Sequence, residues 1–146
     1  MTQVRSYLEF LTLLDETPLR LARGQRLFEA GAAGDGRMYV VREGTIVLRS
    51  GRRVLETVGP GGIVGEMALI DPAPRSATAV AGEDCAVSAV DQRMFDTLVR
   101  RVPGLALEVM RILARRLRRT TRGSSRPSAP RRPSPRRRRS TRKTRR

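Results

Sequence analysis

The hydrophobic residues near the N-terminus follow a helical period. In residues 3–14, apolar side chains recur every three or four positions, at Val4, Leu8, Leu11 and Leu14. This spacing places them on one face of a helix. The pattern therefore predicts a short amphipathic helix over residues 3–14.

The pattern changes to short strands between residues 19 and 90. Runs rich in β-branched and small apolar residues occupy 37–41, 45–49, 53–58, 76–81 and 85–90. Eleven of the 13 glycines lie between positions 24 and 82 and separate these runs. Many short strands divided by turn residues favour a sandwich or a small barrel over alternating βαβ units.

Helical spacing returns after residue 90. Residues 91–102 carry apolar side chains on one face, and Asp91 is a suitable N-cap residue for this helix. Pro103 and Gly104 interrupt the pattern, and a second helix is predicted over residues 105–119. We expect three methionines in the hydrophobic core: Met67, Met94 and Met110.

The charge of the chain is divided between two regions. Among its 146 residues, 30 Lys and Arg against 14 Asp and Glu give a formal charge of +16. Residues 1–109 contain all 14 acids and 13 Arg, for a charge of −1, whereas residues 110–146 carry +17. Residues 122–146 are rich in Arg, Ser and Pro and contain no large apolar side chain. We therefore expect one folded domain at residues 1–121 and a disordered basic tail at residues 122–146.

The composition excludes several kinds of chemistry. The chain has no His and one cysteine, Cys85, which excludes His-dependent catalysis, a Cys-cluster metal site and an internal disulfide. We expect no catalytic residues, no metal site and no cofactor. No apolar run approaches the roughly 18–20 residues of a membrane span. The N-terminus also lacks the pattern of a signal peptide, so the sequence predicts a cytoplasmic protein.

The residues most informative about function lie between positions 61 and 81. Gly65 permits an unusual backbone angle, and Glu66 opens an apolar segment that is predicted to form one helical turn. Unpaired N–H groups at the start of such a turn, together with Arg75, suit a phosphate, because the guanidinium can bond two oxygens at once. Glu66 suits a ligand hydroxyl, and Ser76 adds a donor. An internal ion pair between Glu66 and Arg75 is the alternative that this spacing leaves open.

These residues resemble the phosphate-binding cassette of cyclic-nucleotide-binding domains. The family pattern is Gly-Glu, a short apolar helix and then Pro-Arg-Ser/Thr-Ala-Thr; here residues 65–69 read GEMAL and residues 74–78 read PRSAT. Upstream glycines and apolar residues between positions 24 and 44 resemble the first strands and turns of the family. The resemblance covers residues 10–121. It implies an eight-stranded β-roll, which is jelly-roll-like, with one helix before it and two after it.

The resemblance also implies a ligand and its contacts. The ligand would be cAMP or cGMP, and the domain would be a sensor or regulatory module rather than an enzyme. Glu66 would bind the ribose 2′-hydroxyl and Arg75 the cyclic phosphate. The remaining contacts would come from residues around these two: Gly65, Met67, Ala68, Ser76 and Ala77.

The last helix resembles that of the cyclic-AMP receptor protein superfamily, whose members are bacterial transcription regulators. On this likeness Thr120 and Thr121 fall where a Thr-Ser pair contacts the adenine amino group. The likeness implies that helix 105–119 acts as a lid over the base and can form a homodimer. The chain continues into an Arg-rich segment where the superfamily has a helix-turn-helix domain, so we expect no DNA reading by such a domain.

A second hypothesis assigns the function to the basic tail. Residues 122–146 would bind nucleic acid non-specifically, or an acidic partner, through counterion release, with the β-domain as a scaffold. A solvated tail without a partner, attachment to an anionic membrane and a tail from a shifted reading frame are the other interpretations that the sequence leaves open.

Overall fold

The β-structure consists of eight short strands. The computed structural model describes residues 8–13, 17–71 and 73–124, of which residues 8–13 are helical. The strands are β1 (Leu19–Leu21), β2 (Arg26–Phe28), β3 (Met38–Glu43), β4 (Ile46–Ser50), β5 (Arg53–Val58), β6 (Ile63–Val64), β7 (Thr78–Ala81) and β8 (Cys85–Val90). The helices are α2 (Met67–Ile70), α3 (Gln92–Arg101) and α4 (Leu105–Ser124).

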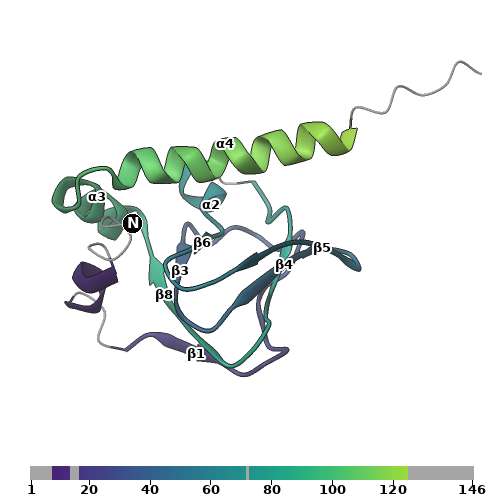
Figure 1. Ribbon diagram of the computed structural model, residues 1–146, viewed down its shortest axis with the longest axis horizontal. Coiled ribbons are helices and arrows are strands. Elements are labelled where there is room, and N and C mark those ends of the chain that lie inside the picture. The colour runs from purple at the N-terminus through teal and green to yellow at the C-terminus, as the bar shows by residue number, and fades with distance from the viewer. Residues whose placement is uncertain (1–7, 14–16, 72, 125–146) are drawn as a thin grey trace, which may run out of the picture. The chain divides into compact units, whose positions relative to one another are not determined.

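The strands form two antiparallel sheets of four. The first sheet has the order β1-β8-β3-β6 and the second has the order β2-β7-β4-β5. Figure 1 shows the two sheets as a rolled β-structure in which strands distant in sequence, such as β3 and β8, run beside each other. This architecture confirms the predicted β-roll with helices before and after it.

The hydrophobic core lies between the two sheets. The first sheet contributes Val41 and Val87, which are fully buried, and the second contributes Ile46 and Ala79, which are also fully buried. Because side chains alternate between the two faces of a strand, the neighbours of these residues lie on the opposite faces; on the first sheet Val40, Ala86 and Ser88 are buried there as well.

The helix boundaries follow from local chemistry, with one difference from the expectation. The side chain of Asp91 accepts a hydrogen bond from the Met94 N–H at 2.8 Å, which confirms the predicted N-cap of α3. The last helix ends at Ser124, whereas the sequence predicted an end near residue 119. The added residues 120–124 read TTRGS, and only Arg122 among them has a high helix propensity, so local propensity does not explain the extension.

The contacts divide the chain into two compact units, Met1–Arg111 and Ile112–Arg146, with the division inside α4. The boundary predicted after residue 121 stays a prediction, since residues 125–146 lie outside the described part of the chain. The three methionines expected in the core are not fully buried: Met67 is 49% exposed, Met110 is 57% exposed and Met94 is partly buried. Met67 on α2 and Met110 on α4 lie on helix faces that are not covered by the β-structure, so their apolar character does not bury them.

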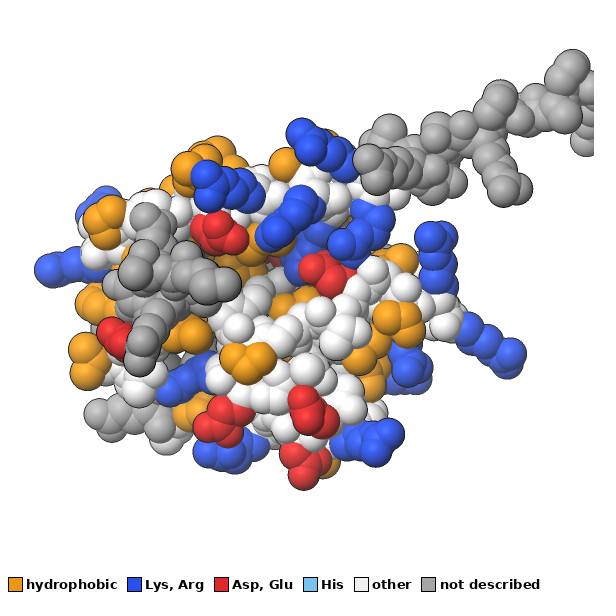
Figure 2. Space-filling view, in the orientation of Figure 1, with side chains coloured by type: hydrophobic (Ala, Val, Ile, Leu, Met, Phe, Trp, Pro, Cys, Tyr) orange, Lys and Arg blue, Asp and Glu red, His pale blue; other side chains and the backbone are white. Residues whose placement is uncertain are grey.

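None of the helices in the described segments is both long enough and apolar enough to cross a membrane. Figure 2 shows acidic and basic side chains interspersed on the visible face, as the near-zero charge of residues 1–109 leads one to expect.

Candidate functional site

The turn before α2 requires a glycine. Gly65 has a φ of +72°, which is unfavourable for residues with a side chain. A Cβ atom at this position would lie 2.5 Å from Nη1 of Arg75 and 3.2 Å from Cε1 of Phe28. Gly65 therefore permits both the turn and the close approach of the Arg75 guanidinium to the backbone.

The predicted helical turn is present as α2, and two backbone N–H groups of this turn donate to carbonyls within the same segment. The Ala68 N–H donates to the Gly65 carbonyl at 3.2 Å, and the Leu69 N–H donates to the Glu66 carbonyl at 3.1 Å. The expectation of unpaired N–H groups along residues 65–68 is therefore wrong at Ala68. Met67 points outward from the same turn, as its exposure shows.

Arg75 is the centre of the site. Its side chain is only 5% exposed, and its guanidinium makes three hydrogen bonds to groups from different segments. Nη1 donates to the Gly65 carbonyl at 3.0 Å; Nη2 donates to Oδ1 of Asp35 at 2.7 Å and to the Arg37 carbonyl at 2.9 Å. These bonds and the ion pair with Asp35 offset the cost of burying the charge.

An aromatic pair supports the guanidinium. The guanidinium carbon of Arg75 lies 4.3 Å from the centre of the Phe28 ring, within the range of a cation–π interaction. Phe28 in turn contacts Tyr39, with the ring centres 6.2 Å apart. Phe28 therefore fixes the guanidinium from one face, while the hydrogen bonds hold its edge.

Asp35 links the guanidinium to the β2–β3 connection. Its Oδ1 also accepts from the Arg37 N–H at 3.0 Å, and its Oδ2 accepts from the Tyr39 hydroxyl at 2.9 Å. The pKa of the Tyr39 hydroxyl is raised above its ordinary value, chiefly because the group is buried and secondly because it donates this hydrogen bond to Asp35. Asp35 thus orients Arg75 and is itself oriented by its neighbours.

Glu66 is a second buried charged residue at this site. It is 5% exposed, and its side chain makes no capping bond to α2. Among the described residues, the buried polar or charged side chains are Glu66, Arg75 and Ser88, and the first two lie on either side of α2 in sequence. Buried charges are costly, so two of them beside one short helix mark a candidate ligand site.

The structure brings together most of the residues predicted for this site. The bond from Arg75 to the Gly65 carbonyl joins the segment 65–68 to the segment 75–77. Ser76 is exposed and Ala77 is partly exposed. Thr120 and Thr121 lie within α4, but their side chains are outside the described part, so their role stays a prediction.

Three residues of the site had no predicted role: Phe28, Asp35 and Tyr39. Each belongs to a stretch that the sequence analysis assigned to the strand framework. The signal in the sequence is weak, since Asp35 is 40 positions from Arg75 and only the folded sheets bring them together. Among the described residues, no group of three or more His, Cys, Asp or Glu side chains could hold a metal ion.

Comparisons with known proteins agree with this fold. The family model described as "Cyclic nucleotide-binding domain" matches residues 18–102. The "Cyclic AMP receptor protein" of Thermus thermophilus is 38% identical over 101 residues, which cover 66% of this chain and 46% of that protein. The chain spans about half the length of this and similar bacterial relatives.

Two solved structures share the fold. The Thermus thermophilus "Catabolite Activator Protein" superposes with a TM-score of 0.63 and 31% identity, over 84% of this chain and 57% of that one. The N-terminal domain of a transcriptional regulator from Streptomyces coelicolor superposes with a TM-score of 0.52 and 34% identity, over 88% of this chain and 99% of that one.

Proposed function

The chain belongs to the cyclic nucleotide-binding domain family, and we propose that it binds cyclic AMP between α2 and Arg75 as a non-catalytic sensor. The observation that carries the proposal is the buried Arg75 guanidinium, bonded to the Gly65 carbonyl next to the buried Glu66. The names of the similar proteins support cAMP as the ligand. Cyclic GMP is the competing ligand.

Arg75 would bind the cyclic phosphate by exchanging a partner. Its three hydrogen bonds use both N–H groups of Nη2 and one of Nη1. Each edge of a guanidinium that can hold two oxygens includes Nη2, so a bidentate phosphate contact requires Nη2 to release Asp35 or the Arg37 carbonyl. Of these two partners, Asp35 is the one that Nη2 would release more readily, because its side chain is 46% exposed and water can solvate its carboxylate after the exchange.

Glu66 would accept a hydrogen bond from the ribose 2′-hydroxyl. A carboxylate is an acceptor only, so it selects a hydroxyl donor and disfavours a second phosphate. Ser76, which is exposed, would add a hydroxyl donor to the phosphate, with Gly65, Met67, Ala68 and Ala77 forming the surrounding wall.

The α4 helix would serve as the lid and as a dimer contact. Thr120 and Thr121 would then contact the adenine, as the family resemblance implies. The exposed apolar residues Leu107, Met110 and Leu117 support a dimer, since intervals of three and seven residues place them on one face of the helix. A ligand can shift such a lid only through its different affinities for the two states.

Calorimetric titration of the full chain with cAMP, cGMP and linear 5′-AMP tests the proposal. We expect saturable binding of cAMP and weaker binding of 5′-AMP. Arg75→Lys keeps the charge but cannot form a two-oxygen contact, so we expect a loss of affinity on the order of tenfold or more. Arg93→Lys, at an exposed position on α3, is the matched control. Absence of binding by the wild type at millimolar cAMP would refute the proposal.

The role of Glu66 is tested separately with 2′-deoxy-cAMP. The wild type should bind this analogue less tightly than cAMP. In Glu66→Gln the affinities for cAMP and the analogue should differ less, because the proposed acceptor of the 2′-hydroxyl hydrogen bond is the carboxylate. The exposed Glu83 provides the control variant Glu83→Gln. An unchanged preference for cAMP in Glu66→Gln would show that another group contacts the 2′-hydroxyl.

A further inference from the structure

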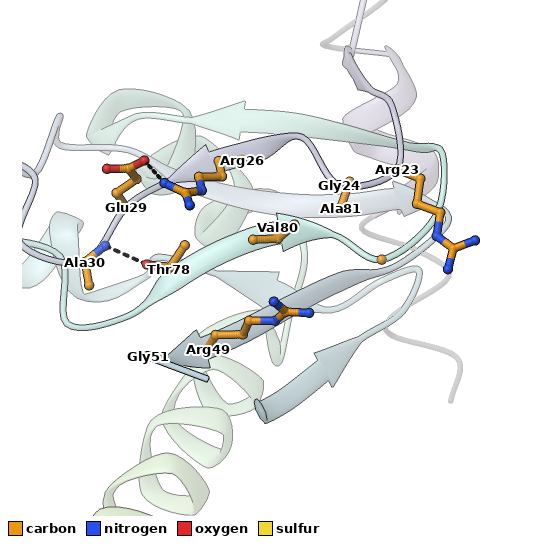
Figure 3. A pocket seen from close by; sticks show the side chains of 11 residues that line it. Arg23, Gly24, Arg26, Glu29, Ala30, Arg49, Gly51, Thr78, Val80 and Ala81 are labelled. Atoms are coloured by element: carbon orange, nitrogen blue, oxygen red, sulfur yellow. Dashed lines mark hydrogen bonds and ion pairs between the residues drawn. The ribbon is translucent and has the colours of Figure 1, made fainter. Parts of the chain in front are cut away.

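The outer face of the second sheet carries a hollow separate from the site of Glu66 and Arg75. Its volume is about 550 Å³. Three strands form it in the order β2-β7-β4, together with the turns at their ends. Figure 3 shows Val80 on its floor, between Arg26 on β2 and Arg49 on β4, with Thr78 at one end and Arg23 at the other.

The floor of the hollow is apolar and held by backbone hydrogen bonds. Ala81 accepts from the Gly24 N–H at 2.8 Å and donates to the Gln25 carbonyl at 2.9 Å. The Gly82 N–H donates to the Thr45 carbonyl at 3.0 Å. Because the backbone groups beneath the hollow are bonded in this way, its shape exists before any partner arrives. Such preorganisation lowers the entropy cost of binding.

The walls of the hollow are basic. Arg23, Arg26 and Arg49 line it, and Glu29 is the one lining residue with an acidic side chain, so their formal charge is +2. Glu29 pairs with Arg26. Among the described residues, no carboxylate lies within ion-pair distance of the Arg23 or Arg49 guanidinium. Two cations therefore face a hollow in a body whose residues 1–109 sum to −1.

We propose that this hollow docks an extended acidic segment of a partner protein. The strand register places Arg26 opposite Val80 and Arg49 opposite Thr78. Two strand spacings and a two-residue offset separate the Cα atoms of the two arginines by about 12 Å. Side chains four residues apart lie on one face of an extended segment and are about 13 Å apart, so two acids at such positions can meet these two arginines, with Arg26 exchanging its exposed partner Glu29 for one acid.

The apolar floor favours a peptide over the alternatives. The residue midway between two such acids lies on the same face of the segment and can place a small apolar side chain against Val80, whereas a nucleic-acid backbone has no such group. The Arg-rich residues 125–146 of this chain carry the same sign of charge as the walls and are repelled. The ligand that fits this hollow is thus an acidic segment from a different protein.

Amide chemical-shift mapping on the full chain tests the proposal. The probe is a short peptide with two Glu four residues apart, Val midway between them and Ser at the remaining positions, and the control peptide has Lys in place of Glu. We expect saturable shifts, with the acidic peptide only, at the residues of the hollow: Gly24, Thr78, Val80, Ala81 and Gly82. Shifts confined to residues 105–146 would overturn the proposal, because they would assign the binding to the basic tail.

Charge variants provide the second arm. Arg26→Ser combined with Arg49→Ser should weaken the binding seen at the hollow about threefold or more, since the two arginines placed opposite the acids are lost. The matched control, Arg93→Ser with Arg101→Ser on α3, removes the same charge from exposed positions elsewhere and should leave it within about twofold. Equal effects of the two pairs would overturn the proposal. The same shifts with a DNA duplex, at higher affinity than the peptide, would also overturn it in favour of a nucleic-acid surface.

Discussion

Replacement of Gly65 by alanine separates backbone strain from the loss of the guanidinium contact. Gly24 and Gly65 both have positive φ values, +84° and +72°, so an added side chain strains both turns. A Cβ on Gly24 would meet nothing within 4 Å, whereas a Cβ on Gly65 would lie 2.5 Å from Nη1 of Arg75. Gly24→Ala is therefore the matched control for Gly65→Ala.

The expected magnitudes follow from these contacts. The left-handed conformation costs a residue with a side chain about 1–2 kcal/mol, which applies to both variants. In Gly65→Ala the guanidinium must also move away and lose its 3.0 Å bond to the Gly65 carbonyl. A hydrogen bond to a charged group contributes about 1.5–3 kcal/mol, so the total for Gly65→Ala is about 2.5–5 kcal/mol.

Urea unfolding followed by circular dichroism measures the two free energies of unfolding. We expect Gly65→Ala to lose at least about 1.5 kcal/mol more than Gly24→Ala. Its cAMP affinity should fall by roughly 10- to 150-fold, since the displaced guanidinium no longer meets the phosphate. Equal destabilisation by the two variants would refute the argument, because backbone strain alone would then explain both.

Four other predictions concern separate parts of the molecule. The raised pKa of Tyr39 means that the folded state loses stability as the pH rises from about 10 through that pKa; Asp35→Asn should lower the pKa, and an unchanged phenolate absorbance titration would contradict the assigned cause. Asp91→Ala should cost about 0.5–2 kcal/mol in urea unfolding, whereas Asp91→Asn should retain most of the cap. Met110→Glu should convert a dimer to a monomer in light scattering after gel filtration, and a monomeric wild type would contradict the dimer proposal. The cAMP dissociation constant should change less than about threefold between about 50 and about 500 mM NaCl, since Arg75 and Glu66 are buried and salt screens buried charges little; a steep change would show that long-range attraction by the basic segment dominates.

The sequence predicted the longer elements because their patterns are local. The runs on β3, β4, β5, β7 and β8 are β-branched and bounded by glycines, and α3 has both a cap and an apolar face. The strands β1, β2 and β6 have two or three residues each, which is too short for a period to appear. Pairing with β8, β7 and β3 makes them strands, so their existence depends on contacts distant in the sequence.

The sequence predicted which residues belong to the candidate site but not which residues surround them. Gly65, Glu66 and Arg75 lie within eleven consecutive positions, so a local motif suffices to find them. The partners of Arg75 come from elsewhere: Asp35 is 40 positions away, and Phe28 lies on β2. The basic hollow escaped prediction for the same reason, since the strand order β2-β7-β4, rather than any sequence spacing, brings Arg26 and Arg49 to one face.

The partners of Arg75 give the proposed sensor a physical route from ligand to structure. Because both N–H groups of Nη2 are already bonded, a phosphate would gain its contact by exchange, and the binding free energy would be the difference between two sets of bonds. The group released in the proposed exchange would be Asp35, which also accepts hydrogen bonds from the Arg37 N–H and the Tyr39 hydroxyl. The connection between β2 and β3 would then have different contacts in the free and bound states. That difference in contacts is what a ligand needs in order to shift a population of conformations, and a pre-oriented but unpartnered arginine would not supply it.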